Sequence, residues 1–206
     1  MQYQDLNLVN HTKALAKKGL QLRPFVSSAD GTMESLNAII TGLPEVGVLT
    51  NYQPESNQTF PTAPALHFKK LGFKTQFFYG GYLTWQRLGD FAKSQGFDEV
   101  YGAPHIANWL TTTEWGVDDR SLFNFILETL DNETPTYNVI MTTSNHPPFN
   151  IDLEAEGFDE AQLETVMQAY PNSPATIRQL GHTWYADKVM HEFIKKSDTN
   201  FTAKAT

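Results

Sequence analysis

The sequence predicts an α/β protein whose sheet is largely parallel. Segments in which apolar residues recur every three or four positions, as on one face of a helix, alternate with short segments rich in aromatic and β-branched residues, as in strands. The strand-like segments are separated by helical ones. This order is typical of βαβ units, whose strands run parallel.

The composition fits one globular domain over residues 1–206. The chain has 15 Lys and Arg against 23 Asp and Glu, a net charge of −8, 40% hydrophobic residues and no Cys. The apolar content excludes a disordered chain, and the lack of Cys excludes disulfides and thiolate metal sites. The acid excess argues against nucleic acid as a partner, because phosphate backbones are bound by clusters of Lys and Arg.

Neither a membrane span nor a targeting signal is visible in the chain. No apolar run approaches the ~20 residues of a transmembrane helix. Residues 1–5 have neither the basic start nor the apolar stretch of a signal peptide. Read as a complete protein, such a chain is expected in the cytoplasm.

The first elements are delimited by glycines. A helix is expected at residues 10–18, because Asn10 can cap its start and Gly19 supplies a left-handed stop. An extended segment follows at residues 20–26. A second helix is expected at residues 32–41, where apolar residues recur at helical spacing and Gly42 follows the last of them.

The middle of the chain reads as a loop, a helix, a strand and another helix. Residues 50–61 are rich in Thr, Pro, Asn and Ser and are expected to be a loop, with a helix at residues 62–71. Residues 73–79 are mostly aromatic or β-branched, which favours a strand. The next helix is expected to start near Trp85 and to end at Gly96.

The last third adds two strands and two helices. A short strand is expected at residues 97–101, and a helix after Asp118, which is a good N-cap. Residues 137–142 are the strongest strand candidate in the chain. An acidic stretch at residues 152–164 is interpreted as solvated surface, and a final helix is expected at residues 175–196.

Ligands of parallel α/β sheets bind beyond the carboxyl ends of the strands. Three loops at this edge are therefore of interest, namely those before Thr32, after Tyr79 and after Thr142. Thr32 lies at a helix start, where unpaired N–H groups and the helix dipole favour an anion and lower the energy of an alkoxide. The alternative is a simple N-cap, the usual role of Thr at such a position.

The other two loops carry an Arg and a His. Trp85 and Arg87 offer a flat apolar face and a bidentate phosphate ligand; the alternative is a core Trp beside a surface Arg. His146, in a Pro-rich loop, can donate to a phosphoryl oxygen or act as general acid; the alternative is an exposed His. The remaining His residues have no metal-ligand spacing. Together, a hydroxyl, an Arg and a His at one sheet edge favour phosphoryl or sulfuryl transfer.

Five motifs, in order, resemble the lipoteichoic acid synthase and phosphoglycerol transferase family of the alkaline phosphatase/sulfatase superfamily. They are residues 31–44 (GTMESLNAIITGLP), 71–81 (LGFKTQFFYGG) with Trp85-x-Arg87, 115–119 (WGVDD), 143–149 (TSNHPPF) and 185–188 (YADK). The resemblance implies an alkaline-phosphatase-like three-layer sandwich with a mostly parallel sheet, incomplete at both ends. Residues 1–206 would then form a single partial catalytic domain.

The resemblance also implies roles for individual residues. Thr32 would be both a metal ligand and the nucleophile that forms a phospho-threonine intermediate. Trp85 and Arg87 would hold the glycerol-phosphate group, and His146 would assist at the phosphoryl group. A divalent metal, typically manganese, would activate the nucleophile. The family moves glycerol phosphate from a phospholipid to a glycan or polyglycerol-phosphate acceptor on the extracytoplasmic face of the cell membrane, which replaces the cytoplasmic expectation.

The chain departs from the family pattern at both ends. Family members open with an apolar strand ending in a metal-binding Glu and close with a metal-binding Asp-His pair, and neither motif is present. Thr32 is thus the single family metal ligand here. We expect the chain alone to be inactive, to bind manganese poorly, to reach a membrane only through segments missing here, and to self-associate through exposed sheet edges.

Two alternatives to a phosphoglycerol transferase stay open. One is a sulfatase or phosphatase of the same superfamily. Sulfatases mature a Cys or Ser in a Cys/Ser-x-Pro-x-Arg context, which the sequence around Thr32 lacks. The other is a non-catalytic remnant or interaction module that keeps the fold without the metal.

Overall fold

The computed structural model describes residues 7–24, 26–45, 47–107, 113–131, 133–168 and 176–202. The strands are β1 (Lys74–Tyr79), β2 (Glu99–Tyr101) and β3 (Thr136–Met141). The helices are α1 (Asn10–Ala16), α2 (Thr32–Thr41), α3 (Pro64–Lys70), α4 (Leu88–Ser94), α5 (Ala103–Ile106), α6 (Asp119–Thr129), α7 (Glu160–Met167) and α8 (Ile177–Thr202). Short 3₁₀ turns are η2 (Thr50–Tyr52), η3 (Pro54–Asn57) and η4 (Trp85–Arg87).

The three strands form one parallel sheet in the order β2-β1-β3, which confirms the predicted parallel sheet. β1 is central, and Gln76 pairs with Glu99 on one side and with Asn138 on the other. The side chains of Phe77 and Phe78 are fully buried on opposite faces, because successive residues of a strand point to opposite sides. β1 is therefore the wall shared by two hydrophobic cores.

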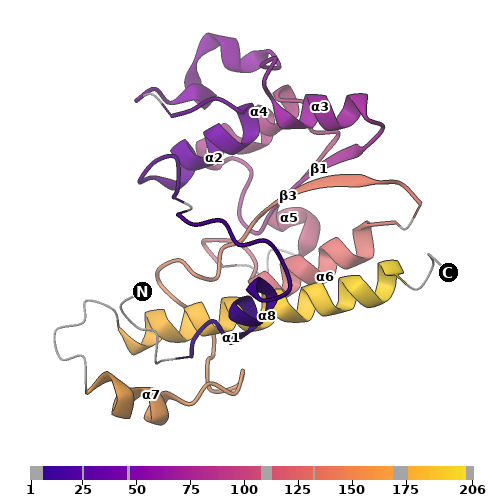
Figure 1. Ribbon diagram of the computed structural model, residues 1–206. Coiled ribbons are helices and arrows are strands. Elements are labelled where there is room, and N and C mark those ends of the chain that lie inside the picture. The colour runs from indigo at the N-terminus through magenta and orange to yellow at the C-terminus, as the bar shows by residue number, and fades with distance from the viewer. Residues whose placement is uncertain are drawn as a thin grey trace.

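Helices cover both faces of the sheet, so the chain forms three layers (Figure 1). α2, α3 and α4 lie on one face, and α5, α6 and α8 lie on the other. The predicted three-layer α/β arrangement is confirmed. All three strands run in the same direction, so their carboxyl ends meet at one edge of the sheet.

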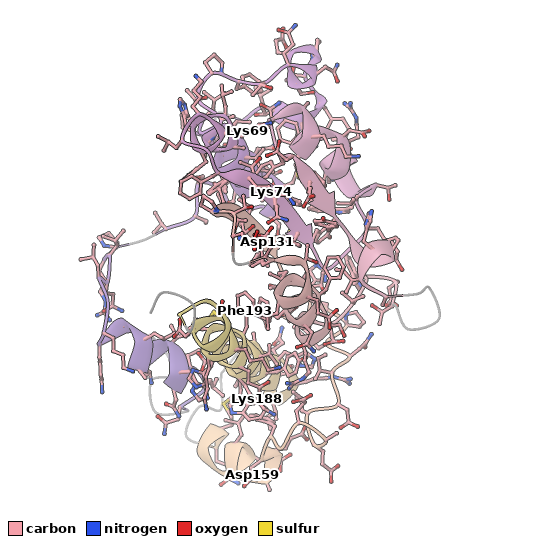
Figure 2. The ribbon with its side chains drawn as sticks, turned by 90° about the vertical axis from the view of Figure 1, so that its right-hand side faces the viewer. Lys69, Lys74, Asp131, Asp159, Lys188 and Phe193 are labelled. Atoms are coloured by element: carbon pink, nitrogen blue, oxygen red, sulfur yellow. The ribbon has the colours of Figure 1, made fainter. Side chains whose placement is uncertain are left out.

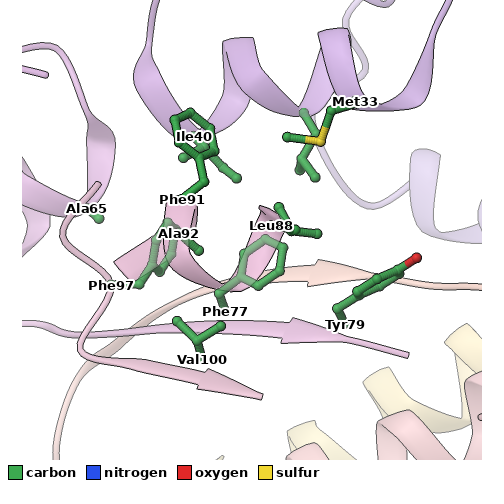
Figure 3. Packing of buried hydrophobic residues seen from close by; sticks show 11 residues of the cluster. Met33, Ile40, Ala65, Phe77, Tyr79, Leu88, Phe91, Ala92, Phe97 and Val100 are labelled. Atoms are coloured by element: carbon green, nitrogen blue, oxygen red, sulfur yellow. The ribbon is translucent and has the colours of Figure 1, made fainter. Parts of the chain in front are cut away.

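The first core lies between β1 and the helices α2 and α4 (Figure 3). Met33 and Ile40 of α2 pack with Leu88 and Phe91 of α4 over Phe77. Burying each of these side chains contributes roughly 1.5–3 kcal/mol. This packing fixes α2 above the sheet, with its N-terminus toward the carboxyl end of β1.

The second core lies between β1 and the helices α6 and α8. Phe78 packs with Leu122 and Ile126 of α6 and with Tyr185 and Val189 of α8. Further along α8, Phe193 points toward α6 (Figure 2), where its ring stacks on that of Phe123 at 4.7 Å between centroids. α8 is thus held against α6 over several turns.

α1 packs against α8, and its N-terminus is capped from α8. The expected cap at Asn10 is not formed: the N-cap position is Val9, and its side chain makes no capping hydrogen bond. Instead the Asp187 carboxylate accepts hydrogen bonds from the backbone N–H groups of His11 and Thr12, each at 2.9 Å. Asn10 does not cap α1, because the buried Asp187 carboxylate of α8 accepts the hydrogen bonds of the first N–H groups instead.

Some helix boundaries differ from the prediction. α3 begins at Pro64 rather than at residue 62, because the Thr62 hydroxyl donates to the Thr41 carbonyl at 2.6 Å and Pro is suited to a first helical turn. α8 is described from Ile177, so the predicted start at residue 175 lies outside the described residues. None of the described helices is long and apolar enough to cross a membrane.

Candidate active site

A cavity of about 180 Å³ opens at the carboxyl ends of β1 and β3. Its walls include Tyr79 and Met141, the last residues of these strands. Thr32, Trp85 and His146, which the sequence placed on three different loops, all line it. The parallel sheet brings Trp85 and His146 together because each follows the carboxyl end of a strand, and Thr32 reaches the same edge at the N-terminus of α2.

Thr32 is the first residue of α2, and its hydroxyl does not cap the helix. The N-cap residue is Gly31, which has extended backbone angles and no side chain to cap with. Within the described part of the chain the Thr32 side chain, which is exposed, makes no hydrogen bond. The N-cap alternative is therefore not what the structure shows, and Thr32 lines the cavity at the positive end of a helix.

The loop before Thr32 is tied to α2 by Ser35. The Ser35 hydroxyl accepts a hydrogen bond from the Ala29 N–H at 3.2 Å and donates to the Ala29 carbonyl at 3.0 Å. One side chain thereby satisfies both backbone groups of a loop residue. The N-terminal turn of α2 is held in place although the preceding segment is largely exposed.

Trp85 and Arg87 lie on the turn η4, but only Trp85 lines the cavity. The Arg87 guanidinium donates to the Asn51 carbonyl at 3.3 Å and lies 6.0 Å from the centre of the Tyr52 ring. Among the described residues it makes no ion pair within 4.0 Å. Arg87 is therefore not part of the cavity wall, and its charged group lies against Asn51 and Tyr52 instead.

The backbone conformation explains why Trp85 lines the cavity and Arg87 does not. Gln86 and Arg87 are consecutive residues with φ of 52° and 56°, a left-handed conformation that is unfavourable for residues other than Gly. It also delays α4, which begins at Leu88 instead of near Trp85. The buried Asn51 side chain donates to the Gln86 carbonyl at 2.7 Å and so holds the turn. Sequence reasoning missed Asn51, because it lies in a stretch that reads only as a loop.

His146 lies on the loop after β3, and its ring packs at a tilt against that of Trp115. The two ring centroids are 4.0 Å apart, with an angle of 42° between the planes. The His146 Nδ1 is 2.6 Å from the Pro147 carbonyl oxygen, which can only accept, so Nδ1 carries a hydrogen. The other ring nitrogen, Nε2, makes no hydrogen bond with the described residues. It is thus the atom of this ring that is able to exchange a proton with a ligand.

Glycines let three loops meet at the cavity. Gly116, beside Trp115, has φ of 114°, and a Cβ there would collide with the Gly80 carbonyl. A Cβ on Gly80 would in turn lie 3.0 Å from the Thr143 hydroxyl. The absence of side chains on these glycines therefore lets the segments that carry Gly80, Gly116 and Thr143 pack closely against one another.

Two buried ionisable side chains hold the His146 loop, and sequence reasoning assigned no role to either. Asp119 is 2% exposed, and burial raises its pKa, against the hydrogen bonds from the backbone of Ser144 and Thr143, which lower it. His182 is fully buried, and burial lowers its pKa. The signal for Asp119 was its place in the motif WGVDD, whereas His182 lies in a helix with no motif.

The described residues do not by themselves make a metal site. The cavity offers the hydroxyls of Thr32, Thr142 and Thr143 but no carboxylate. No group of three or more His, Asp or Glu among the described residues is arranged to hold a metal ion. Divalent ions such as Mn²⁺ are held by several oxygen or nitrogen ligands, usually with carboxylates among them. These residues therefore do not fit a resident divalent ion.

Known proteins resemble this chain over most of its length. The sulfatase family profile matches residues 2–202. The lipoteichoic acid synthase of Staphylococcus saprophyticus is 22% identical over 173 residues, and lipoteichoic acid synthase 1 of Bacillus subtilis is 26% identical over 173 residues. Both alignments cover 82% of this chain but only 24% and 25% of those proteins. The chain thus spans about a quarter of the length of the curated relatives it matches.

Solved structures show the same fold. A Vibrio parahaemolyticus protein in the alkaline phosphatase superfamily superposes with a TM-score of 0.75 at 22% identity, covering 94% of this chain and 45% of that one. The lipoteichoic acid synthase LtaP from Listeria monocytogenes superposes with a TM-score of 0.76 at 20% identity, covering 94% and 47%. The Streptococcus pyogenes phosphoglycerol transferase GacH, solved in complex with sn-glycerol-1-phosphate, gives 0.62 at 15% identity, covering 94% and 51%.

These matches confirm the alkaline-phosphatase-like fold expected from the motifs. The profile match covers nearly the whole chain, and the relatives are those that the five motifs resemble. The chain belongs to the sulfatase family and, within it, is similar to the lipoteichoic acid synthases and phosphoglycerol transferases.

Proposed function

We propose that this chain carries the nucleophile and part of the substrate site of a phosphoglycerol transferase. The observation that supports this most is the placement of Thr32, which is exposed, does not cap its helix and lines one cavity with Trp85 and His146. The substrate would be the glycerol-phosphate head group of a phospholipid. The acceptor would be a glycan or polyglycerol phosphate on the extracytoplasmic face of the membrane.

In the first step the Thr32 oxygen attacks phosphorus and the bond to the lipid diacylglycerol oxygen breaks. The Thr32 proton passes to water, and a protonated His146 donates its Nε2 hydrogen to the leaving oxygen. In the second step an acceptor hydroxyl attacks the phospho-threonine, and the now neutral Nε2 takes the acceptor proton. Thr32 leaves and regains a proton from water, so both residues return to their starting state.

The other residues of the site bind and orient. The half-buried Trp85 ring, 6.1 Å from that of Tyr79, provides an apolar wall for the glycerol carbons. The Arg87 guanidinium has a carbonyl and an aromatic ring as partners, so its charge is available to a phosphate at the mouth of the cavity. To reach the phosphate, the side chain would give up its bond to the Asn51 carbonyl.

Thermal-shift measurements with sn-glycerol-1-phosphate test this site through binding, because the chain alone is expected to be inactive. We expect the ligand to stabilise the wild-type chain and Trp85→Ala to weaken its affinity about tenfold, since a lost aromatic contact is worth up to about 1.5 kcal/mol. Thr32→Ala should lose the stabilisation by the ligand, whereas its matched control Thr134→Ala, which replaces an exposed Thr far along the chain, should keep it. A chain that millimolar ligand leaves unchanged, with or without Mn²⁺, would instead be a non-catalytic interaction module.

Metal binding is tested separately. The resemblance implies Mn²⁺ in the complete domain, but Thr32 is the one family ligand that this chain contributes. We therefore propose that residues 1–206 bind Mn²⁺ poorly. Titration calorimetry with MnCl₂ checks this, and stoichiometric micromolar binding would contradict it.

A further inference from the structure

The loop that joins β3 to the segment before α7, residues 142–151, carries His146 and has few apolar anchors of its own. Asn145, His146, Pro147 and Pro148 are all exposed. An exposed loop with so little buried surface has little to fix its position. Yet His146 is placed against Trp115 at the cavity, so other contacts must determine where the loop lies.

The start of the loop is held by Asp119, the first residue of α6. One oxygen of its carboxylate, Oδ1, accepts hydrogen bonds from the backbone N–H groups of Thr143 and Ser144, each at 2.9 Å. The Asp119 N–H in turn donates to the Ser144 hydroxyl at 2.8 Å. Three hydrogen bonds thus join α6 to the two residues that lead into Asn145 and His146.

The end of the loop is held by His182 of α8. Its Nε2 accepts a hydrogen bond from the Ile151 N–H at 3.0 Å, and its Nδ1 donates to the Arg178 carbonyl at 2.8 Å. The ring also meets the Phe149 ring edge-on, at 5.1 Å between centroids. Arg178 adds a hydrogen bond from Nε to the Phe149 carbonyl at 2.6 Å. These contacts require a neutral His182 with its hydrogen on Nδ1.

We propose that Asp119 and His182 are positioning residues that fix the two ends of the 142–151 loop and thereby set His146 against Trp115 at the cavity. Burying a carboxylate or an imidazole is costly unless hydrogen bonds compensate. Here the Asp119 carboxylate accepts its hydrogen bonds from the backbone of this one loop, and His182 has one partner on the loop and one on its own helix. Among the described residues, Asp119 has no ion pair within 4.0 Å, so its charge is balanced by loop amides. The role in catalysis rests on the proposed function, but the anchoring does not.

Nuclear magnetic resonance of the whole chain tests the anchoring directly. In Asp119→Ala we expect amide exchange at Thr143 and Ser144 to speed up about tenfold or more beyond the change in global stability, because each lost hydrogen bond is worth about 1 kcal/mol. The His146 ring protons, shielded by the Trp115 ring in the wild type, should move downfield. Asp119→Asn keeps an oxygen at Oδ1 and should restore both readouts.

Asp118 provides the matched control for Asp119. It is the neighbouring carboxylate and caps α6 by accepting from the Ser121 N–H at 3.0 Å, and its hydrogen bonds go to Ser121 and Tyr185 rather than to the loop. Asp118→Ala should lower global stability, and amide exchange at Thr143 and Ser144 should speed up only as much as that loss of global stability predicts. For the other anchor, His182→Leu should speed exchange at Ile151, and His182→Gln, whose side-chain oxygen can replace Nε2 as acceptor, should restore it.

The outcomes separate the anchoring from the proposed function. If Asp119→Ala leaves the loop amides and the His146 shifts unchanged, or if Asp119→Asn does not restore them, the anchoring proposal is wrong. A parallel titration with sn-glycerol-1-phosphate reports on the function. A wild-type chain with an anchored loop and no ligand binding would contradict the proposed function alone. Weaker ligand binding by Asp119→Ala with normal binding by Asp119→Asn would support both.

Discussion

At the scale of single residues, the turn after β1 decides what the Trp85-x-Arg87 motif presents to the cavity. Gln86 and Arg87 both adopt left-handed backbone angles, and such strain persists only where the surroundings determine the conformation. Asn51 holds this backbone conformation through its hydrogen bond to the Gln86 carbonyl. The turn lets Trp85 face inward while Arg87 faces out, although one residue separates them.

Replacing the strained residue by glycine should stabilise the protein. Gln86→Gly removes a steric cost of roughly 1–2 kcal/mol but makes the unfolded chain more flexible, so we expect a net gain of about 0.5–1 kcal/mol. Urea denaturation measures the change. Thr84→Gly is the control, because Thr84 has φ of −72° and should lose stability on the same change. A loss of stability in Gln86→Gly would show that its side chain, not its backbone, matters at this position.

At the scale of elements, α6 and α8 act on the His146 loop through Asp119 and His182, and His182 makes this contact sensitive to pH. Burial lowers the pKa of His182, against the hydrogen bond to the Arg178 carbonyl. The Arg178 charge lowers this pKa further, and the Asp119 charge raises it. Protonation of Nε2 would remove the acceptor for the Ile151 N–H.

We therefore expect the protein to lose stability as the pH falls below about 6.5, the ordinary pKa of an unfolded His. Above that pH the imidazole is neutral in both states and has no effect. Below it the unfolded chain takes up the proton before the folded chain does. The free energy of unfolding therefore falls until the pH reaches the lowered pKa of His182 in the folded protein. Unfolding curves from pH 7.5 to 5 should show this slope in the wild type and a shallower one in His182→Gln.

The comparison between these two proteins isolates His182. The raised pKa of Asp119 acts in the opposite direction, since its protonation at low pH favours the folded state, and it acts in both proteins. Parallel slopes in the wild type and His182→Gln would mean that His182 binds its proton equally well in the folded and unfolded chains, which would contradict a lowered pKa in the folded protein.

The docking of α1 is a second prediction at the scale of elements. Asp187 of α8 is 5% exposed and accepts from the His11 N–H, the Thr12 N–H and the Thr12 hydroxyl. Asp187→Ala removes this cap, which is worth about 1 kcal/mol or more, and should free α1 from α8. Limited proteolysis in residues 17–24 should then become faster, while α8 stays protected. Asp152→Ala, in a turn away from α1, should leave cleavage there unchanged.

At the scale of the whole molecule, β1 joins the two cores into one cooperative unit. Phe77 belongs to the core under α2 and α4, and Phe78 belongs to the core over α6 and α8. Because both side chains extend from the same strand, neither core can open without disturbing the pairing of β1 with its neighbours. The cavity at the end of β1 depends on both cores for the same reason.

Truncation on either face should therefore destabilise the whole chain. We expect Phe77→Ala and Phe78→Ala each to cost about 3–5 kcal/mol, as for other fully buried Phe residues. Circular dichroism and hydrogen exchange should show both cores unfolding in one transition. Leu71→Ala, which removes a side chain that is 72% exposed, should change stability by less than about 0.5 kcal/mol. Separate transitions for the two cores would contradict this account.

Much of the architecture could be predicted because its determinants are local. The strand 73–79 was placed within one residue of β1, and Asp118 caps α6 as expected, accepting from the Ser121 N–H. Apolar periodicity and helix caps act within a few residues, so they can be read along the chain. The meeting of Trp85 and His146 at one sheet edge follows from the parallel order of the strands, and the packing of α2 over the sheet brings Thr32 to the same cavity.

The sequence by itself thus determined the order of elements, the parallel sheet and the edge at which the candidate site lies. Only the tertiary structure decided that Arg87 lies against Asn51 instead of in the cavity wall, that Asp187 caps α1 and that Asp119 and His182 hold the His146 loop. The reason is separation along the chain: Asn51 meets Gln86 across 35 positions and Asp187 meets His11 across 176. Hydrogen bonds over such distances exist only once the layers have packed and excluded water from their partners.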